Sequence, residues 1–200
     1  AGAHHNNKKA VVYFIKEAPM AIKALEKMGV QFAKSKNNFL QNREAGHTQN
    51  RIIHVGDHTG KSIMEVLAMH IKKQRNISVW KNSFAVDLIV KNKTCYGVHV
   101  YHKGKIASVF ARRIILATGG IGQLYEYTTN PKVTTGDGIA LAARAGCIMK
   151  DLEFIQFHPT AFAKTQSPLF LISETLRGAG AKLLNSKGQR FMSKYHPAQE

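Results

Sequence analysis

The chain has 200 residues, of which 44% are hydrophobic, and its formal net charge at pH 7 is +17. This length allows one domain or one domain and part of another, and the apolar content is sufficient for a packed core. No uninterrupted apolar stretch is long enough to span a bilayer, and the polar first ten residues do not resemble a signal peptide. We therefore expect no membrane span.

The two cysteines, Cys95 and Cys147, lie far apart and lack the spacing of a metal site. Two unpaired thiols are typical of a reducing compartment, so we predict a cytoplasmic location and no metal. The lysines and arginines are spread along the chain without an interleaved row of aromatic residues. We expect no nucleic-acid partner, and the diffuse basicity is suited to attracting a dianionic substrate.

Residues 8–28 are predicted to form two helical pieces that break near Pro19, with an apolar core-facing stripe and a C-terminal cap at Gly29. Residues 37–50 are predicted to be a loop, and residues 60–74 a helix. The segment Thr59-Gly60-Lys61-Ser62 lacks the upstream glycine of a phosphate-binding loop, so it is interpreted as the start of that helix.

From residue 77 onward the apolar residues alternate with a period of two, which predicts a three-stranded meander with a tight turn at Lys103-Gly104. A further apolar strand is predicted at 113–117. It leads into Thr118-Gly119-Gly120-Ile121-Gly122, where glycines let the backbone approach a bulky ligand. The turn Gly136-Asp137-Gly138 then opens a helix, 138–145, whose first amides can meet an anion or a polar cofactor edge.

These glycines match neither the G-x-G-x-x-G pattern nor a Walker loop, and a bare structural turn is the simpler alternative. His158, directly before a proline, follows the second glycine turn. Together the three features indicate a nucleotide cofactor held beside a site for an acidic substrate.

The segments ATGGIGQLYEYTTNP, TGDGIALAARAG and LEFIQFHPT resemble the flavoprotein group of succinate dehydrogenase, fumarate reductase and L-aspartate oxidase. Within this group the chain is most similar to the L-aspartate oxidases, because of Arg43-Glu44-Ala45-Gly46-His47-Thr48 and the YTTNP segment. The similarity runs from about residue 8 to the C-terminus.

The resemblance implies an α/β fold with an α+β cap, namely a FAD-binding two-dinucleotide-domain-like fold with an inserted β-meander. Residues 1–151 would be a partial FAD-binding domain without its N-terminal glycine-rich fingerprint. Residues 152–200 would begin the substrate-capping domain and stop before the arginine that transfers a proton in the family.

The resemblance also implies roles for individual residues. Glu44 would receive the substrate ammonium, which succinate lacks, and His158, Ser173 and His47 would bind substrate. Glu174 and Arg177, three residues apart, would relay a proton, although a surface ion pair is the alternative interpretation. The positions matched to FAD binding are Phe84, Ala85, Thr118, Gly119, Gly120 and Asp137.

The implied activity is oxidation of L-aspartate to iminoaspartate for NAD (quinolinate) biosynthesis, with electrons passed to oxygen or fumarate and quinolinate synthase as a pathway partner. The alternatives are a fumarate reductase or succinate dehydrogenase flavoprotein and a basic binding module without chemistry. Two positions depart from the family: Ser173 replaces threonine but keeps the hydroxyl, and Ala179 replaces an acid, which puts the local hydrogen bonding in doubt.

Overall fold

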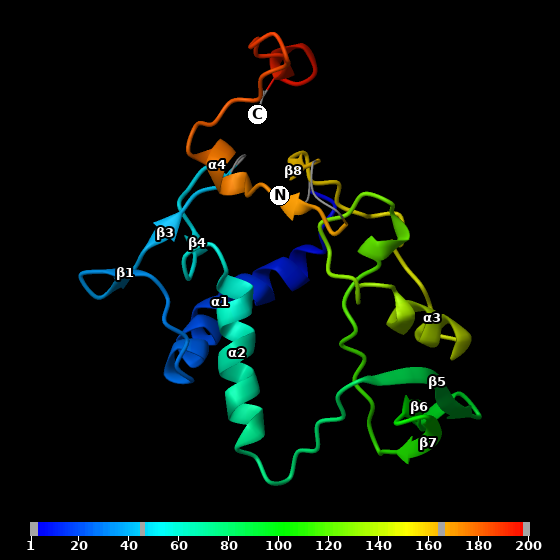
Figure 1. Ribbon diagram of the computed structural model, residues 1–200. Helices are drawn as coiled ribbons and strands as arrows, with labels where there is room; N and C mark the ends of the chain where they lie inside the picture. Colours follow the sequence, from blue (N-terminus) through cyan, green and yellow to red (C-terminus); the bar gives the residue numbers. More distant parts are fainter. Residues whose placement is uncertain (1–3, 45–46, 164–166, 198–200) are drawn as a thin grey trace. The chain divides into compact units, whose positions relative to one another are not determined.

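The computed structural model describes residues 4–44, 47–163 and 167–197. The chain divides into two compact units, one formed by residues 1–78 and 173–200 and the other by residues 79–172. We call these unit 1 and unit 2 and describe each by itself (Figure 1). The proposed domain boundary at residues 151/152 lies inside unit 2. That boundary stays a prediction.

Unit 1 begins with helix α1, Lys8–Lys27. The Asn7 side chain caps it by accepting a hydrogen bond from the Ala10 amide at 3.2 Å, as expected for an N-cap asparagine. The predicted break at Pro19 is wrong, because the helix continues through it. A proline removes one N–H donor and crowds the carbonyl four residues earlier, but the residues after it can still adopt helical angles. The predicted cap is confirmed, since Gly29 ends the helix with φ +110°.

The prediction that the α1 stripe is core is wrong for its N-terminal half. Phe14 is 72% exposed and Ile15 62% exposed. The buried apolar side chains of unit 1 instead follow the helix, at Val30 and Phe32. The Phe32 ring meets Phe39 edge to face, with ring centroids 5.9 Å apart.

The segment predicted as a loop forms short antiparallel strands. Strand β1 (Lys34–Ser35) pairs with β2 (Asn38–Phe39), and β3 (Gln41–Asn42) pairs with β4 (Ile52–Ile53). The predicted second helix is confirmed as α2, Thr59–Lys72. The part of unit 1 after residue 172 holds the short helix α4, Glu174–Gly178, and the 3₁₀ turn η2, Met192–Lys194.

Unit 2 contains the predicted meander, with strand order β5-β6-β7 (Figure 1). The strands are β5 (Ser83–Lys91), β6 (Thr94–His102) and β7 (Lys105–Phe110). The turn at Lys103-Gly104 is confirmed, and both residues have positive φ, at 50° and 81°. Two positive φ angles in a two-residue loop match the right-handed twist of the flanking strands.

The strand predicted at 113–117 does not form a β-ladder in the described structure. Ile115, at its centre, is 89% exposed. Apolar composition alone does not make a strand, because the backbone groups also need a neighbouring strand to pair with.

The rest of unit 2 contains the 3₁₀ turn η1 (Gly122–Leu124), helix α3 (Asp137–Arg144) and the short pair β8 (Ala161–Phe162) and β9 (Phe170–Leu171). The predicted end of α3 is confirmed by Gly146, with φ +81°. Arg144 joins this helix to β5: its NH2 group donates to the Val86 carbonyl at 3.1 Å, and its Nε lies 3.3 Å from Asp87 Oδ1. Leu141 is the buried apolar anchor of the helix.

Candidate functional site

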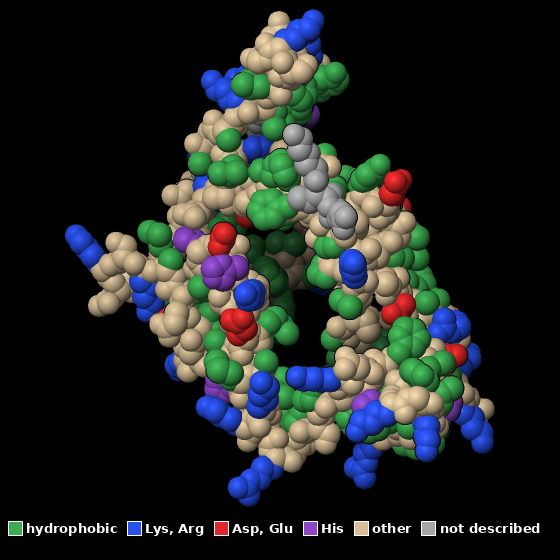
Figure 2. All heavy atoms as spheres, in the orientation of Figure 1, with side chains coloured by type: hydrophobic (Ala, Val, Ile, Leu, Met, Phe, Trp, Pro, Cys, Tyr) green, Lys and Arg blue, Asp and Glu red, His purple; other side chains and the backbone are tan. Residues whose placement is uncertain are grey.

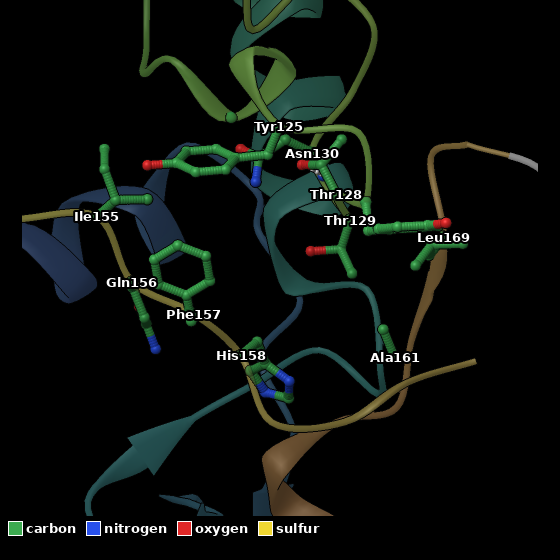
Figure 3. Close-up of a pocket in the computed structure, with 12 residues that line it drawn as sticks. Tyr125, Thr128, Thr129, Asn130, Ile155, Gln156, Phe157, His158, Ala161 and Leu169 are labelled. Carbon is green, nitrogen blue, oxygen red and sulfur yellow. Dashed lines mark hydrogen bonds between the residues drawn. The ribbon is translucent and has the colours of Figure 1, made fainter. Parts of the chain in front are cut away.

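A cavity of about 270 Å³ in unit 2 contains His158 (Figure 3). Its walls come from Gly122, Tyr125, residues 127–130, residues 155–158, Ala161 and Leu169. Two aromatic rings line it together: Tyr125 and Phe157 meet edge to face with centroids 5.2 Å apart. The remaining polar groups are mainly hydroxyls and amides, which suits a small polar ligand beside an aromatic wall.

Gln156 lines the same cavity and was not among the predicted site residues. No spacing in the sequence singles it out, since the adjacent residues Ile155 and Phe157 line the cavity as well. The described structure therefore adds an amide donor and acceptor to the histidine that the sequence singled out.

His158 is held by the backbone of Thr160. Its Nδ1 lies 3.2 Å from the Thr160 amide nitrogen and 3.2 Å from the Thr160 carbonyl oxygen. The His158 side chain is half-buried, and Thr160 is only 8% exposed. A ring nitrogen fixed in this way leaves Nε2 as the atom available to a ligand in the cavity.

The two glycine turns of unit 2 lie against each other. The Gly136 amide donates to the Gly120 carbonyl at 3.1 Å. A Cβ at Gly138 would lie 1.8 Å from Thr118 Oγ1, so only glycine permits this approach. Gly136 caps α3 with φ +79°, a conformation that side chains rarely adopt.

The exposed backbone of residues 118–120 leaves room for a flat cofactor. Gly119 has φ +74°, and a Cβ built there would meet nothing within 4 Å, so its face is open. Asp137, at the start of α3, accepts a hydrogen bond from Thr135 Oγ1 at 2.8 Å and stays exposed. This open backbone beside the start of α3 could hold the polar edge of a cofactor.

The remaining predicted cofactor residues, Phe84 and Ala85, lie at the start of β5. They pair with Tyr101 and Val100 of β6, and Phe84 is 52% exposed. Neither they nor residues 118–120 line the cavity around His158, which the glycine segment reaches through Gly122. The structure thus joins His158 to the end of the glycine segment rather than to its beginning.

In unit 1, helix α4 packs against the backbone at Glu44. A Cβ at Gly178 would lie 2.5 Å from the Arg43 carbonyl oxygen and 3.0 Å from Glu44 Cα. The His47 amide donates to the Glu44 carbonyl at 3.1 Å. Of the predicted site residues, Glu44 contacts α4, His47 is hydrogen-bonded to Glu44, and Ser173 is the N-cap of α4.

The predicted pair Glu174 and Arg177 is not a surface ion pair. Arg177 NH2 lies 3.5 Å from Glu174 Oε1, and the arginine side chain is only 10% exposed. Its Nε and NH2 are buried and make no hydrogen bond within the described residues. A buried guanidinium whose Nε has no hydrogen-bond partner in the described structure fits an anionic partner far better than solvent.

Ser173 acts locally as the N-cap of α4. Its hydroxyl accepts a hydrogen bond from the Thr175 amide at 3.3 Å and donates to Thr175 Oγ1 at 3.1 Å. Histidine nitrogens near β3 and β4 are less well satisfied: His47 Nδ1 and both ring nitrogens of His54 are buried without a partner in the described structure. His54 was not predicted, and it directly follows the apolar strand β4.

Asp57 is a carboxyl with a perturbed pKa. His58 Nδ1, 2.5 Å from Asp57 Oδ1, lowers the pKa of Asp57 through a side-chain hydrogen bond. The Asp57 side chain is 95% exposed, so the pair contributes little to stability and marks no site.

Comparison with known proteins defines the class. The chain matches the FAD binding domain family over residues 1–200 and belongs to that family. The FAD prediction is thereby confirmed. The α/β class is also supported, whereas the finer two-domain description stays a prediction.

The curated relatives are L-aspartate oxidases. The chain is 42% identical to the enzyme of Nostoc sp. and 43% identical to that of Synechocystis sp., in each case over all of this chain but only 35% and 36% of the relative. The chain therefore spans little more than a third of the length of these relatives. The predicted resemblance to L-aspartate oxidases is confirmed.

The chain also resembles solved structures of a fumarate reductase chain and of Sdh1. E. coli quinol fumarate reductase FrdA superposes with a TM-score of 0.85 at 27% identity, over 94% of this chain and 33% of that chain. Mycobacterium smegmatis Sdh1 gives a TM-score of 0.73 at 34% identity, over 92% of this chain and 33% of that chain. Both identities are below those of the L-aspartate oxidases.

Two further observations bear on the alternatives. None of the helices in the described parts of the chain combines the length and the apolarity required to cross a bilayer. Figure 2 shows lysine and arginine side chains scattered over the face drawn rather than gathered over one element.

Proposed function

We propose that the protein containing this chain oxidises L-aspartate to iminoaspartate with FAD and passes the electrons to oxygen or fumarate. The observation that carries this proposal is the 42–43% identity to L-aspartate oxidases along the whole chain. When bound, FAD supplies the acceptor for the hydride that leaves the substrate Cα.

The residues of unit 2 would hold the cofactor and one end of the substrate. The glycine backbone at 118–120 would lie against the flavin, and Asp137 with Phe84 and Ala85 would complete its contacts. His158 would donate from Nε2 to a substrate carboxylate, since its Nδ1 already faces Thr160. A donor fixed before substrate arrives does not have to be ordered during binding.

The residues of unit 1 would recognise the amino acid and handle the proton. Glu44 would accept hydrogen bonds from the substrate ammonium, while Ser173 and His47 would bind substrate. The pair Glu174 and Arg177 would pass a proton, and the low exposure of Arg177 strengthens its interaction with an anion. In the overall reaction the substrate loses a hydride from Cα and a proton from its amino group. A C=N bond forms between these two atoms.

Glu44 provides the sharpest test. In the intact, flavin-loaded protein, Glu44→Gln should lower kcat/KM for aspartate by about 10- to 150-fold, since a hydrogen bond to a charged group is worth about 1.5–3 kcal/mol. The matched control is Glu65→Gln on α2, where the side chain is 64% exposed, and it should leave aspartate oxidation unchanged. Unchanged aspartate turnover in Glu44→Gln would mean that the assigned role is wrong.

The second candidate is a fumarate reductase or succinate dehydrogenase flavoprotein, which the structural similarity to FrdA and Sdh1 favours. Comparing aspartate and succinate as reductants of the bound flavin separates the two. A basic binding module without chemistry would instead show salt-sensitive DNA binding and no flavin affinity.

The finer proposals follow from the same assignment. We place the protein in NAD biosynthesis, with quinolinate synthase as the partner that consumes iminoaspartate, and in the cytoplasm, where the free thiols Cys95 and Cys147 would stay reduced. The boundary between residues 1–151 and 152–200 would separate the FAD-binding domain from the start of the capping domain.

A further inference from the structure

The ladder between β8 and β9 continues by one more pair, and that pair is irregular. Ala161 is opposite Leu171, so the next residues, Thr160 and Ile172, are opposite each other. The Ile172 amide donates to the Thr160 carbonyl at 3.2 Å. In a regular antiparallel pair the Thr160 amide would return a hydrogen bond to the Ile172 carbonyl.

That return bond is made by a side chain instead. Thr160 Oγ1 donates to the Ile172 carbonyl at 2.9 Å. The Thr160 amide, released from the ladder, donates to His158 Nδ1 at 3.2 Å. The hydroxyl therefore takes the place of the main-chain donor, and the main-chain donor holds the histidine.

The exchange of hydrogen bonds matters because Thr160 is buried. Thr160 is 8% exposed, so its amide has little access to water and needs a protein acceptor. The Ile172 carbonyl has its acceptor role filled by the hydroxyl. If the hydroxyl were absent, the amide and the carbonyl would be free to pair with each other, and the histidine would lose its partner.

The same contact favours one tautomer of the neutral His158 ring. With Nδ1 accepting from the Thr160 amide, the neutral ring has its proton on Nε2. If the ring gains a second proton, Nδ1 can donate to the Thr160 carbonyl, which lies 3.2 Å away and has a second lone pair beside the one used by Ile172. In both states Nε2–H is a donor for the cavity that His158 lines.

The geometry points to Thr160 as a positioning residue for His158, acting by substituting its hydroxyl for its own amide at Ile172. The substrate carboxylate that receives Nε2–H rests on the proposed function, whereas the hydrogen-bond exchange and the tautomer do not. Thr160 does not itself line the cavity among the residues found there. Its effect on substrate therefore passes through the ring of His158.

The test compares Thr160→Val, which keeps the shape and removes the hydroxyl, with Thr160→Ser, which keeps the hydroxyl. In the intact, flavin-loaded protein, nitrogen NMR of His158 should show protonated Nε2 and unprotonated Nδ1 in the wild type and in Thr160→Ser. A His158→Gln variant assigns the signal. Thr160→Val should show a mixture of tautomers.

The kinetic readout should separate positioning from general damage. Thr160→Val should raise KM for aspartate about tenfold, the equivalent of one hydrogen bond, with FAD affinity unchanged. Thr160→Ser should restore KM to near the wild-type value. Thr94→Val, at the exposed start of β6, is the matched control and should change neither KM nor the tautomer.

Three results would overturn the inference: a wild-type His158 with its proton on Nδ1, a Thr160→Val protein with unchanged tautomer and KM, or a Thr160→Ser protein as impaired as Thr160→Val. The first needs no variant, so it decides the matter even if Thr160→Val does not fold. Absence of aspartate oxidation with the expected tautomer would reject the proposed function and leave the positioning role standing.

Discussion

The contact between the two glycine turns of unit 2 gives a quantitative prediction for Gly138→Ala. The new Cβ would lie 1.8 Å from Thr118 Oγ1, 2.8 Å from Thr118 Cβ and 2.9 Å from Thr118 Cγ2. Rotating the threonine side chain relieves contacts to Oγ1 and Cγ2 but not the contact to Cβ, so the backbone must also move. Overpacking of this kind costs about 1–3 kcal/mol.

Alanine also improves the helix, and this gain must be separated from the clash. Replacing glycine by alanine inside a helix is worth up to about 1 kcal/mol. Gly60 in α2 provides the matched control, because a Cβ there meets nothing within 4 Å. Gly60→Ala should therefore show the helix gain alone, and the two variants should differ by about 1–3 kcal/mol in the free energy of unfolding.

Urea denaturation of the intact protein with and without FAD measures this difference. The displaced backbone at residues 118–120 is proposed to contact the flavin, so Gly138→Ala should also weaken FAD binding. Each 1.4 kcal/mol lost from the binding free energy raises the Kd about tenfold. The variant Thr118→Ala with Gly138→Ala should recover part of the loss. Equal stability changes in Gly138→Ala and Gly60→Ala would refute the close approach.

Three further variants test other parts of the structure. Glu174→Gln should lower the free energy of unfolding by about 1–3 kcal/mol in urea denaturation, since Arg177 would lose its charged partner while 10% exposed; no change would mean that the pair is solvated. Gly178→Ala should weaken aspartate binding about tenfold with FAD affinity retained, because its Cβ would press on the Arg43 carbonyl at 2.5 Å; equal binding measured by calorimetry would argue against that contact. Pro19→Ala should raise helicity and the free energy of unfolding by about 1–3 kcal/mol, and a decrease in circular dichroism would contradict a continuous α1.

Local patterns predicted the elements that depend on local interactions. Helix α2 and the turn at Lys103-Gly104 follow from apolar spacing and from residues that tolerate positive φ, and both were found where expected. The predicted break at Pro19 was wrong because a proline lowers the stability of a helix without necessarily ending it. In the 20-residue helix α1 the other residues keep the helix intact. The strand predicted at 113–117 was wrong because a strand needs a neighbouring strand to pair with, and the local spacing of apolar residues does not reveal one.

The features of the candidate site also differ in whether the sequence alone could predict them. The glycine turns and His158 were recognisable from composition and order along the chain. The contact of Gly178 with Glu44 joins residues more than a hundred positions apart, and only the fold reveals it. The role of Thr160 was equally invisible, since the sequence shows a hydroxyl but not whether it substitutes for a backbone donor.

Net charge illustrates why burial has to be known before a charged residue can be interpreted. Most of the basic residues of this chain are exposed, where water screens each charge and a single lysine has little influence on a ligand. Arg177 differs because its side chain is 10% exposed and its Nε and NH2 lack hydrogen bonds in the described structure. A guanidinium in that setting interacts with an anion at a lower effective dielectric, so its energy is several times that of an exposed pair. The chemistry of this chain therefore depends on the few charges that folding removes from water, and the total of +17 says little about it.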